Sequence, residues 1–492
     1  MSQNSPIRAG DVTVPQTRLY IAGEFVDGAG AGGEYDVVSP VTGATIASVP
    51  VPVTADLDRA VQAARAAQRE WSRVGVWQRA AILHKVADLL DERVDRLAPL
   101  LTLEQGKPLA ESVGDLTEAA QLFRLHAEDA VRLHGETIPS TDTSKRVWTF
   151  REAAGTWAIV IPWNFPVLMF AEFVAPGLAT GNAHVVKPPA HTPLTLLAAV
   201  EVLREAGVPD GLVNVLPGAG DFGAELVAHP GIDAIGFIGS SATAEKIVRT
   251  AGLKRSLIEA SGNGPVVVLD DADLAAAARA VVTGAYFNAG QVCCATGRVL
   301  VHDAVREEFA AAVVDAASAA VLGDPFDEKT TLGPMNNELT AAKVDQHLAQ
   351  ARERGFEILL GGGRRSGFPT DLYYEFTVVD GVRQDSLLNT DETFGPVVPI
   401  IGAGSDDELL RIANDDALGL QAAVFTRDMS RAYRFVEELR TGQVVVNESN
   451  GWWDINMPFG GVGGTRTGWG RIGGRHTLED MTDLRTGVLN LR

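Results

Sequence analysis

The sequence has very little cysteine: two residues in a chain of 492, which stand side by side as Cys293 and Cys294. So few thiols cannot build a disulfide framework, and a disulfide between neighbouring residues is geometrically strained. We therefore expect free thiols in a reducing compartment, and a cytoplasmic location. The pair is either reactive or a pair of buried, inert thiols, and the two residues alone do not favour either interpretation.

Basic residues are also few: the chain has 42 lysines and arginines and 63 acidic residues, which gives a formal net charge of −21. A chain this acidic repels phosphate backbones and anionic lipid surfaces, so neither nucleic acid nor a membrane is expected as a partner. No uninterrupted apolar run reaches membrane-spanning length, and residues 1–15 lack the apolar segment of a secretory signal. The 9 histidines show no metal-ligand spacing, so no metal is expected.

Hydrophobic residues make up 46% of the chain and charged residues 21%, which is typical of a globular protein, and the length predicts two or three domains. From Lys145 onward, strand-like and helix-like segments alternate. This rhythm predicts βαβ units around a parallel sheet, hence an α/β fold whose ligands bind beyond the carboxyl ends of the strands. The segments are strands at 156–161, 184–187, 213–216 and 234–238, and helices at 166–180, 194–206, 222–228 and 242–250.

Three helices are predicted before this block: one with its apolar face from Leu57 to Trp71, one at 77–103 and one at 114–133. We interpret the charged residues of all three as solvated faces. A second α/β block is predicted from Ser261 onward. It has strands at 265–270, 298–302, 397–401, 422–426 and 443–447, and helices at 273–287, 305–320 and 339–354.

The segment Gly218–Gly223 matches the dinucleotide fingerprint G-x-G-x-x-G between a strand and a helix. The acidic residue expected about twenty positions later has no clear counterpart, because Glu245 falls inside a predicted helix. The sequence therefore predicts a dinucleotide-like fold without ordinary Rossmann docking of the cofactor.

A thiol nucleophile needs a donor for the oxyanion and, for a later hydrolysis, a base that activates water. The sequence offers three candidates. Asn164 follows a predicted strand, Glu259 ends an apolar strand where a carboxylate adds no stability, and Glu392 lies in the segment 392–396. Each candidate also has a structural explanation. Asn164 can form a turn, Glu259 can be a paired edge carboxylate, and Glu392 can cap a helix or loop.

Taken together and in order, these segments resemble the NAD(P)-dependent aldehyde dehydrogenase superfamily, of the non-acylating (hydrolytic) type, over essentially the whole chain. The matching pieces are 162–166, 187–188, 237–240, Glu259, 270–273, 290–293, 392–396, 442–447 and 458–461.

The resemblance implies a role for each matching residue. Cys293 corresponds to the nucleophile, Asn164 and the Cys293 backbone N–H to the oxyanion donors, and Glu259 to the base for water. The implied cofactor-binding residues are Trp163, Lys187, Ala190, Gly220, Ser240, Glu392 and Phe394. The implied substrate-binding residues are Phe165, Met169, Glu172, Cys294, Trp453 and Phe459.

The resemblance also implies an architecture: a Rossmann-like cofactor domain, an α/β catalytic domain and a small β arm for oligomerisation. The corresponding boundaries are 18–134 and 152–258 for the cofactor domain, 259–464 for the catalytic domain, and 135–151 and 477–492 for the arm. A homodimer or homotetramer is expected.

Departures from the family pattern bear on specificity. Ala190 replaces a glutamate that binds the adenosine ribose in many NAD⁺-preferring members, so we expect NADP⁺ to be accepted. Trp452 and Trp453 suggest an aromatic or bulky apolar aldehyde. Glu172 disfavours an anionic substrate if it faces the substrate passage, and no added arginine pair indicates a semialdehyde carboxylate.

Two alternatives remain at this point. A CoA-acylating semialdehyde dehydrogenase shares the fold and the thiol but commonly lacks the glutamate at position 259. A catalytically silent binding or structural protein on the same scaffold would have no need of Cys293, Glu259 and Asn164 together.

Overall fold

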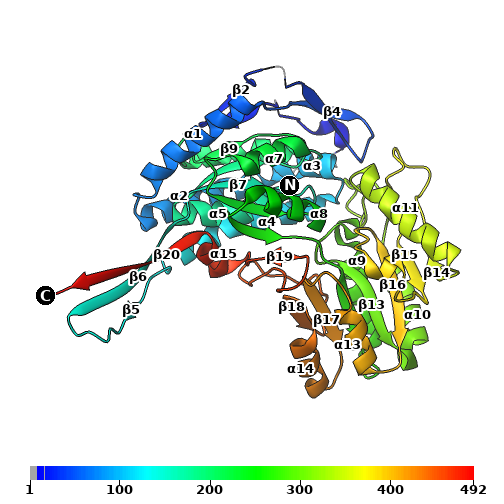
Figure 1. Ribbon diagram of the computed structural model, residues 1–492. Coiled ribbons are helices and arrows are strands. Elements are labelled where there is room, and N and C mark those ends of the chain that lie inside the picture. The colour runs from blue at the N-terminus through cyan, green and yellow to red at the C-terminus, as the bar shows by residue number, and fades with distance from the viewer. Residues whose placement is uncertain (1–7, 16, 31) are drawn as a thin grey trace, which may run out of the picture.

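The computed structural model describes residues 8–15, 17–30 and 32–492. Two large mixed sheets lie in separate lobes, and a narrow β arm projects from the first (Figure 1). Of the segment 1–15, for which no secretory signal is expected, residues 1–7 lie outside the described part of the chain. No described helix combines the length and the apolar character needed to cross a membrane.

The first sheet has eight strands in the order β19-β11-β10-β7-β8-β9-β1-β2. Its five central strands, β11 to β9, run parallel, and β19, β1 and β2 pair antiparallel at the edges. Buried on both faces, the central strands are almost continuously apolar, as parallel strands are. The bounds are β1 Leu19–Ile21, β2 Glu24–Val26, β7 Thr156–Val160, β8 Ala183–Lys187, β9 Val213–Val215, β10 Ala234–Ile238, β11 Arg255–Glu259 and β19 Gly468–Trp469.

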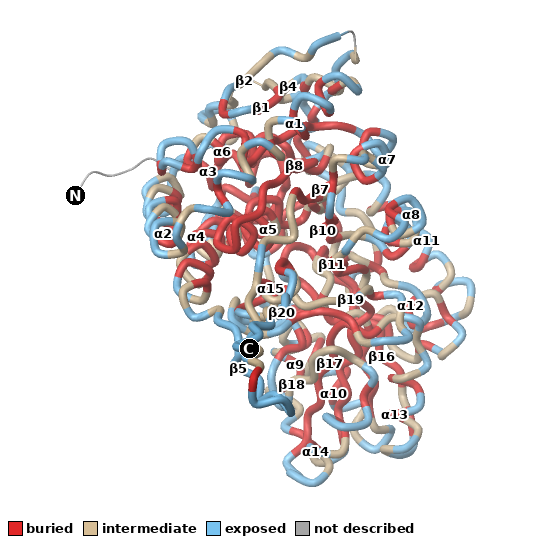
Figure 2. Tube along the Cα trace, turned by 60° about the vertical axis from the view of Figure 1, so that its left-hand side comes forward, coloured by how far each residue is buried: buried red, intermediate tan, exposed pale blue. Residues whose placement is uncertain are grey.

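Helices cover both faces of this sheet, and its core forms the most continuous buried region of the tube view (Figure 2). The helices of this lobe are α1 Thr54–Trp71, α2 Val76–Asp91, α3 Val94–Gln105, α4 Leu109–Ala130, α5 Pro166–Thr180, α6 Leu194–Ala206, α7 Gly220–Ala228, α8 Ser241–Ala251 and α15 Gly474–Asp480, with the short η1 Ala9–Asp11 and the hairpin β3 Glu34–Val38 and β4 Thr45–Pro50 nearby.

The second sheet has seven strands in the order β14-β15-β16-β13-β12-β17-β18, all parallel except β14. Its strands are β12 Gly264–Val268, β13 Thr296–His302, β14 Glu357–Leu360, β15 Thr377–Asp380, β16 Val397–Ala403, β17 Gln421–Phe425 and β18 Gln443–Val446. The helices of this lobe are α9 Leu274–Tyr286, η2 Phe287–Gly290, η3 Asp303–Val305, α10 Arg306–Ala317, α11 Glu338–Glu353, α12 Leu387–Thr390, α13 Asp406–Asn414 and α14 Met429–Glu438.

The single helix predicted at 77–103 is wrong. The chain forms two helices, α2 and α3, because Arg93 leaves helical geometry with φ −110° and ψ 1°. The break redirects the chain, and every residue of α3 from Leu97 to Gln105 is buried. An apolar periodicity that continues across a break does not reveal the change of direction.

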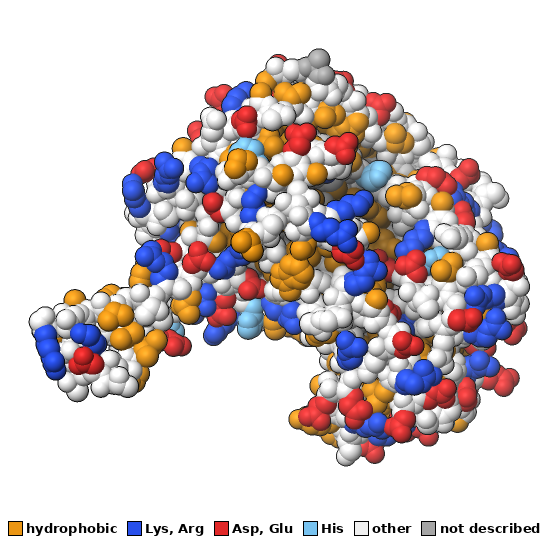
Figure 3. All heavy atoms as spheres, viewed as in Figure 1, with side chains coloured by type: hydrophobic (Ala, Val, Ile, Leu, Met, Phe, Trp, Pro, Cys, Tyr) orange, Lys and Arg blue, Asp and Glu red, His pale blue; other side chains and the backbone are white. Residues whose placement is uncertain are grey.

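The projecting arm is a three-stranded antiparallel sheet in the order β20-β6-β5, with β5 Thr137–Ile138, β6 Lys145–Ala153 and β20 Thr482–Asn490. It extends away from both lobes (Figure 1), and hydrophobic side chains are visible on its surface (Figure 3). The exposed apolar residues are Ile138, Trp148, Leu484, Val488, Leu489 and Leu491.

Candidate active site

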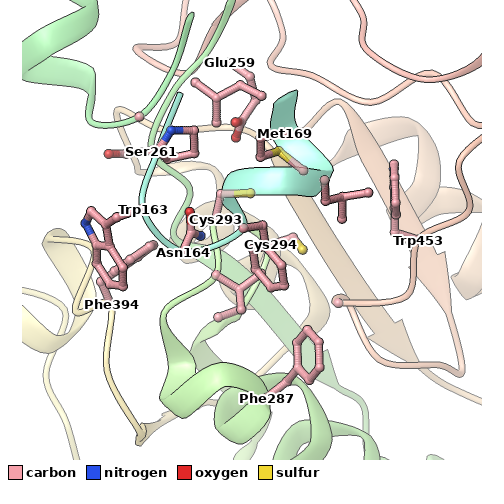
Figure 4. Close-up of a pocket in the computed structure, with 18 of the residues that line it drawn as sticks. Trp163, Asn164, Met169, Glu259, Ser261, Phe287, Cys293, Cys294, Phe394 and Trp453 are labelled. Carbon is pink, nitrogen blue, oxygen red and sulfur yellow. The ribbon is translucent and has the colours of Figure 1, made fainter. Parts of the chain in front are cut away.

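A cavity of about 1020 Å³ opens at the carboxyl edge of the first sheet. Because β7, β10 and β11 are parallel, their ends deliver Asn164, Ser240 and Glu259 to this edge. The loop after η2 brings Cys293 and Cys294 from the second lobe to the same cavity. In Figure 4, Glu259 and Asn164 lie beside Cys293, with Trp163 and Phe394 on one side of the thiol and Trp453 on the other.

A left-handed turn presents the thiol. Asn288, Ala289 and Gly290 have φ of 49°, 55° and 71°, a conformation that costs free energy for the two residues with side chains. At Gly290 a Cβ would lie 2.3 Å from the carbonyl oxygen of Gly395, so no side chain fits there. Such strain persists only where surrounding contacts fix the backbone.

Asn288 is fixed from several directions. Its backbone N–H donates to Glu111 Oε2 at 3.0 Å, and its Oδ1 accepts from Gln105 Nε2 at 2.9 Å. Gln291 Nε2 donates to the Asn288 carbonyl at 2.9 Å, and Gln291 Oε1 accepts from the Asn336 N–H at 2.9 Å. The turn before Cys293 is therefore held rigidly, as a reacting group requires.

The thiol of Cys293 and the carboxyl of Glu259 influence each other. The Cys294 thiol, burial and the Glu259 carboxylate together hold the pKa of Cys293 well above its ordinary range. Burial raises the pKa of Glu259 well above its ordinary range, and the Cys293 thiol partly offsets this. Glu259 Oε1 is buried without a hydrogen-bond partner among the described residues. A buried, unpaired carboxylate oxygen at a cavity is suited to accept a proton from a thiol or a water.

Asn164 lies between the two lobes. Its Nδ2 donates to the backbone carbonyl of Gln291 at 2.9 Å, and the backbone carbonyl of Asn164 accepts from Asn288 Nδ2 at 3.3 Å. One amide hydrogen of Nδ2 is used in the first bond, which leaves the second for a ligand in the cavity that Asn164 lines.

Of the residues predicted to bind the cofactor, Trp163, Ala190, Ser240, Glu392 and Phe394 line the cavity. Lys187 and Gly220 are not among the lining residues. The Lys187 Nζ lies 3.4 Å from the Pro188 carbonyl, and burial lowers the pKa of Lys187 to about 8. Gly220 begins α7, with open space where a Cβ would point.

This edge of the cavity fits an anionic cofactor. Ser240 caps α8 by accepting from the Thr243 N–H, so the positive end of the helix faces the cavity. At Gly239, which lines the cavity, a Cβ would lie 2.7 Å from the Phe237 ring, so no side chain fits there. A ligand can therefore approach the backbone closely at this position. Glu392 Oε1 accepts from the Gly262 N–H at 3.0 Å, and burial raises the pKa of Glu392 to about 7.

Of the residues predicted to bind substrate, Phe165, Met169, Cys294, Trp453 and Phe459 line the cavity, and Glu172 does not. The expectation that Glu172 faces the substrate passage is wrong for this structure. Its side chain is fully buried within the first lobe, and burial raises its pKa to about 8. Met169, three residues earlier on α5, points to the cavity instead.

Sequence reasoning missed one wall of the cavity, the face of α4 that carries Glu111, Asp115 and Glu118. Asp115 and Glu118 belong to the helix predicted at 114–133, whose charges we interpreted as solvated, and Glu111 precedes that predicted helix but lies on α4 in the structure. Their spacing of four and three places them on one face, which was the available signal. Phe287, which stacks on Phe165 with ring centroids 5.8 Å apart, was also missed.

Comparison with known proteins decides the family. Residues 25–486 match the model of the aldehyde dehydrogenase family. The mitochondrial succinate-semialdehyde dehydrogenase of Arabidopsis thaliana is 36% identical, over 96% of this chain and 88% of that protein.

The chain belongs to the aldehyde dehydrogenase family. Among solved structures, an indole-3-acetaldehyde dehydrogenase in complex with NAD⁺ is 34% identical with a TM-score of 0.95, and 98% of each chain is covered. An NADP-dependent enzyme of E. coli is 33% identical with a TM-score of 0.93, covering 97% of this chain and 98% of that one. The α/β fold predicted from the sequence is confirmed. The chain is an NAD(P)⁺-dependent aldehyde dehydrogenase that oxidises an aldehyde to its carboxylic acid.

Proposed function

We propose that Cys293 is the nucleophile of this oxidation and that water activated by Glu259 releases the acid. The observation that carries the proposal is the convergence of the Cys293 thiol, the Asn164 amide and the Glu259 carboxyl on a single cavity that also reaches the N-terminus of α8. Asn164 Nδ2 and the Cys293 backbone N–H stabilise the oxyanion formed when the thiolate adds to the carbonyl.

The residues divide the proton transfers between them. The Cys293 thiol gives its proton to the adjacent Glu259 carboxylate and attacks the aldehyde carbon, forming a thiohemiacetal. The bound nicotinamide cofactor supplies the hydride acceptor for the oxidation that leaves a thioester on Cys293. Glu259 first releases the thiol proton to solvent and then, as a carboxylate again, takes a proton from water; the hydroxide adds to the thioester carbonyl, the thiolate leaves and the acid is released.

The decisive experiment is a turnover assay with the purified protein. Aldehyde-dependent formation of NAD(P)H is expected, with one equivalent of free acid released and no change in product when CoA is added. Aromatic and bulky apolar aldehydes are included because Trp453, Phe165 and Phe287 line the cavity. Formation of an acyl-CoA would contradict hydrolysis through Glu259 and favour the CoA-acylating alternative.

We also propose that NADP⁺ is accepted, because Ala190 lines the cavity without a carboxylate to repel a ribose phosphate. In the variant Ala190→Glu, kcat/KM for NADP⁺ is expected to fall about tenfold or more, since juxtaposed like charges are destabilising. Initial rates with both cofactors measure this. The matched control is Ala190→Gln, which adds similar bulk without charge and is expected to lose far less. Strict NAD⁺ use by the unaltered protein contradicts the proposal.

The arm is proposed to join copies of the chain into a homodimer or homotetramer in the cytoplasm. Its six exposed apolar residues and the long β6–β20 pair would extend or cover the sheet of a neighbouring copy. The proposed division of the chain is a cofactor domain at 18–134 and 152–258, a catalytic domain at 259–464, and the arm at 135–151 and 477–492.

A further inference from the structure

The substrate end of the cavity has an unusual balance of charge. Six acidic residues line the cavity, whereas the only basic residue among its described lining residues is Lys343. Lys343 lies on α11 and pairs with Asp391 at 3.4 Å, next to Glu392 and hence at the cofactor end. The residues that face the substrate end thus include carboxylates and no free cation. The acidic lining residues are Glu111, Asp115, Glu118, Glu259, Glu392 and Glu448.

Lys107 does not alter this balance. It is fully buried, its Nζ forms an ion pair with Asp115 Oδ2 at 3.0 Å, and the same Nζ lies 3.7 Å from the centre of the Phe165 ring. Asp115 Oδ1 accepts from the Leu168 N–H at 2.9 Å. Lys107 and Asp115 therefore neutralise each other, and neither is available to a substrate.

Glu118 differs from Glu111 and Glu448, which also line the cavity but each accept a hydrogen bond from a backbone N–H. It lines the cavity one turn beyond Asp115, and it has no hydrogen bond or ion pair with any described residue. Burial raises its pKa, and the neighbouring Asp115 and Asp454 raise it further, while Lys107 partly offsets them. Unpaired carboxylates that are partly desolvated destabilise the empty cavity, and a positively charged ligand relieves this cost.

The walls beside Glu118 are aromatic. Phe287 and Trp453 line the same cavity, and Asp454, which acts electrostatically on Glu118, follows Trp453 directly. Aromatic faces attract ammonium groups, most strongly where water is excluded. The same rings also accept bulky apolar groups, so the charge at Glu118 decides between these two kinds of substrate.

We propose that Glu118 is a specificity-determining residue that binds the ammonium group of a cationic aldehyde whose carbonyl reaches Cys293. This deepens, and rests on, the proposed function. It also separates this chain from its succinate-semialdehyde dehydrogenase relative, because a carboxylate-bearing aldehyde would meet Glu118 without a described basic residue at that end of the cavity to pair with.

The test compares three aldehydes of similar length with saturating cofactor: a trimethylammonio-butanal, its isostere with tert-butyl in place of trimethylammonium, and glutarate semialdehyde. The unaltered enzyme is expected to show the highest kcat/KM with the cation, about tenfold above the isostere, which corresponds to about 1.4 kcal/mol. Glutarate semialdehyde is expected to rank last. NAD(P)H formation measures all three.

Two variants assign the preference to Glu118. In Glu118→Gln the ratio of kcat/KM for the cation to that for the isostere is expected to fall about tenfold. In Glu118→Lys the preference is expected to reverse in favour of glutarate semialdehyde. The matched control is Glu128→Gln, which removes one exposed charge from the same helix away from the cavity and is expected to leave the ratio unchanged.

The outcomes separate the two proposals. If no aldehyde of the panel or of the aromatic series is oxidised, the proposed function fails. If the kcat/KM for the isostere or for glutarate semialdehyde equals that for the cation, only the role of Glu118 is overturned. The same holds if Glu118→Gln lowers all three rates equally. A reversed preference in Glu118→Lys supports it even where Glu118→Gln is poorly stable.

Discussion

Replacement of Cys293 by alanine is expected to lower aldehyde-dependent NAD(P)H formation by at least roughly a thousandfold, since removal of a nucleophile abolishes the covalent route. The physical reason is the geometry of the turn. Asn288, Ala289 and Gly290 hold a strained left-handed conformation that places the Cys293 thiol beside Glu259 and Asn164. A steady-state assay with each cofactor measures the loss. Circular dichroism and retained cofactor binding show that the variant is folded.

Cys294→Ala is the matched comparison. It also removes one thiol from the pair, but it leaves the Cys293 thiol beside Glu259, and the backbone carbonyl of residue 294 can still accept from Asn450 Nδ2, as it does at 3.1 Å. A much smaller loss is expected. Because Cys293 is partly exposed and Cys294 is buried, iodoacetamide labelling followed by peptide mass analysis should modify Cys293 first, and aldehyde added without cofactor should protect it. Activity that survives in Cys293→Ala and disappears in Cys294→Ala would assign the nucleophile to the neighbour.

The parallel sheet made one edge of the candidate site predictable. Strand and helix segments alternate, so the ends of β7, β10 and β11 had to meet at one edge. Asn164, Ser240 and Glu259 each follow or end one of these strands. Their proximity therefore follows from sequence position and topology, without knowledge of any side-chain contact.

The substrate wall was not predictable in the same way. Glu111, Asp115 and Glu118 share a face of α4, but helical periodicity does not say whether that face meets water, a neighbouring helix or a cavity. Glu172 shows the opposite error. It was placed at the substrate passage by resemblance, whereas in the fold α5 turns it into the protein interior. Both outcomes depend on how α4 and α5 pack together, which is a long-range property.

Glu259→Gln is expected to slow hydrolysis of the thioester more than the attack of Cys293, because a thiol can lose its proton to solvent far more readily than water can. The amide keeps the shape of the side chain but cannot accept a proton from water, so steady-state turnover should fall about 10²–10⁴-fold, the range typical of a lost general base. Rapid mixing with aldehyde and cofactor should give at most one equivalent of NAD(P)H per active site. Mass spectrometry of the quenched protein should then find an acyl group on Cys293.

The pH dependence distinguishes the base from a merely structural carboxylate. Burial raises the pKa of Glu259 well above its ordinary range, so the carboxyl stays protonated until the pH exceeds that raised pKa, and the base form grows as the pH rises. Hydrolysis of the thioester in the unaltered enzyme should therefore accelerate with pH through one deprotonation. In Glu259→Gln the plateau of this titration should be lost and the slow residual rate should rise in proportion to hydroxide concentration, because only hydroxide from solvent remains as the attacking species. A variant that releases acid at the normal rate with an unchanged pH profile would assign the activation of water to another group. Glu392, whose pKa burial raises to about 7, is the next carboxyl in the cavity, and Glu392→Gln provides the comparison.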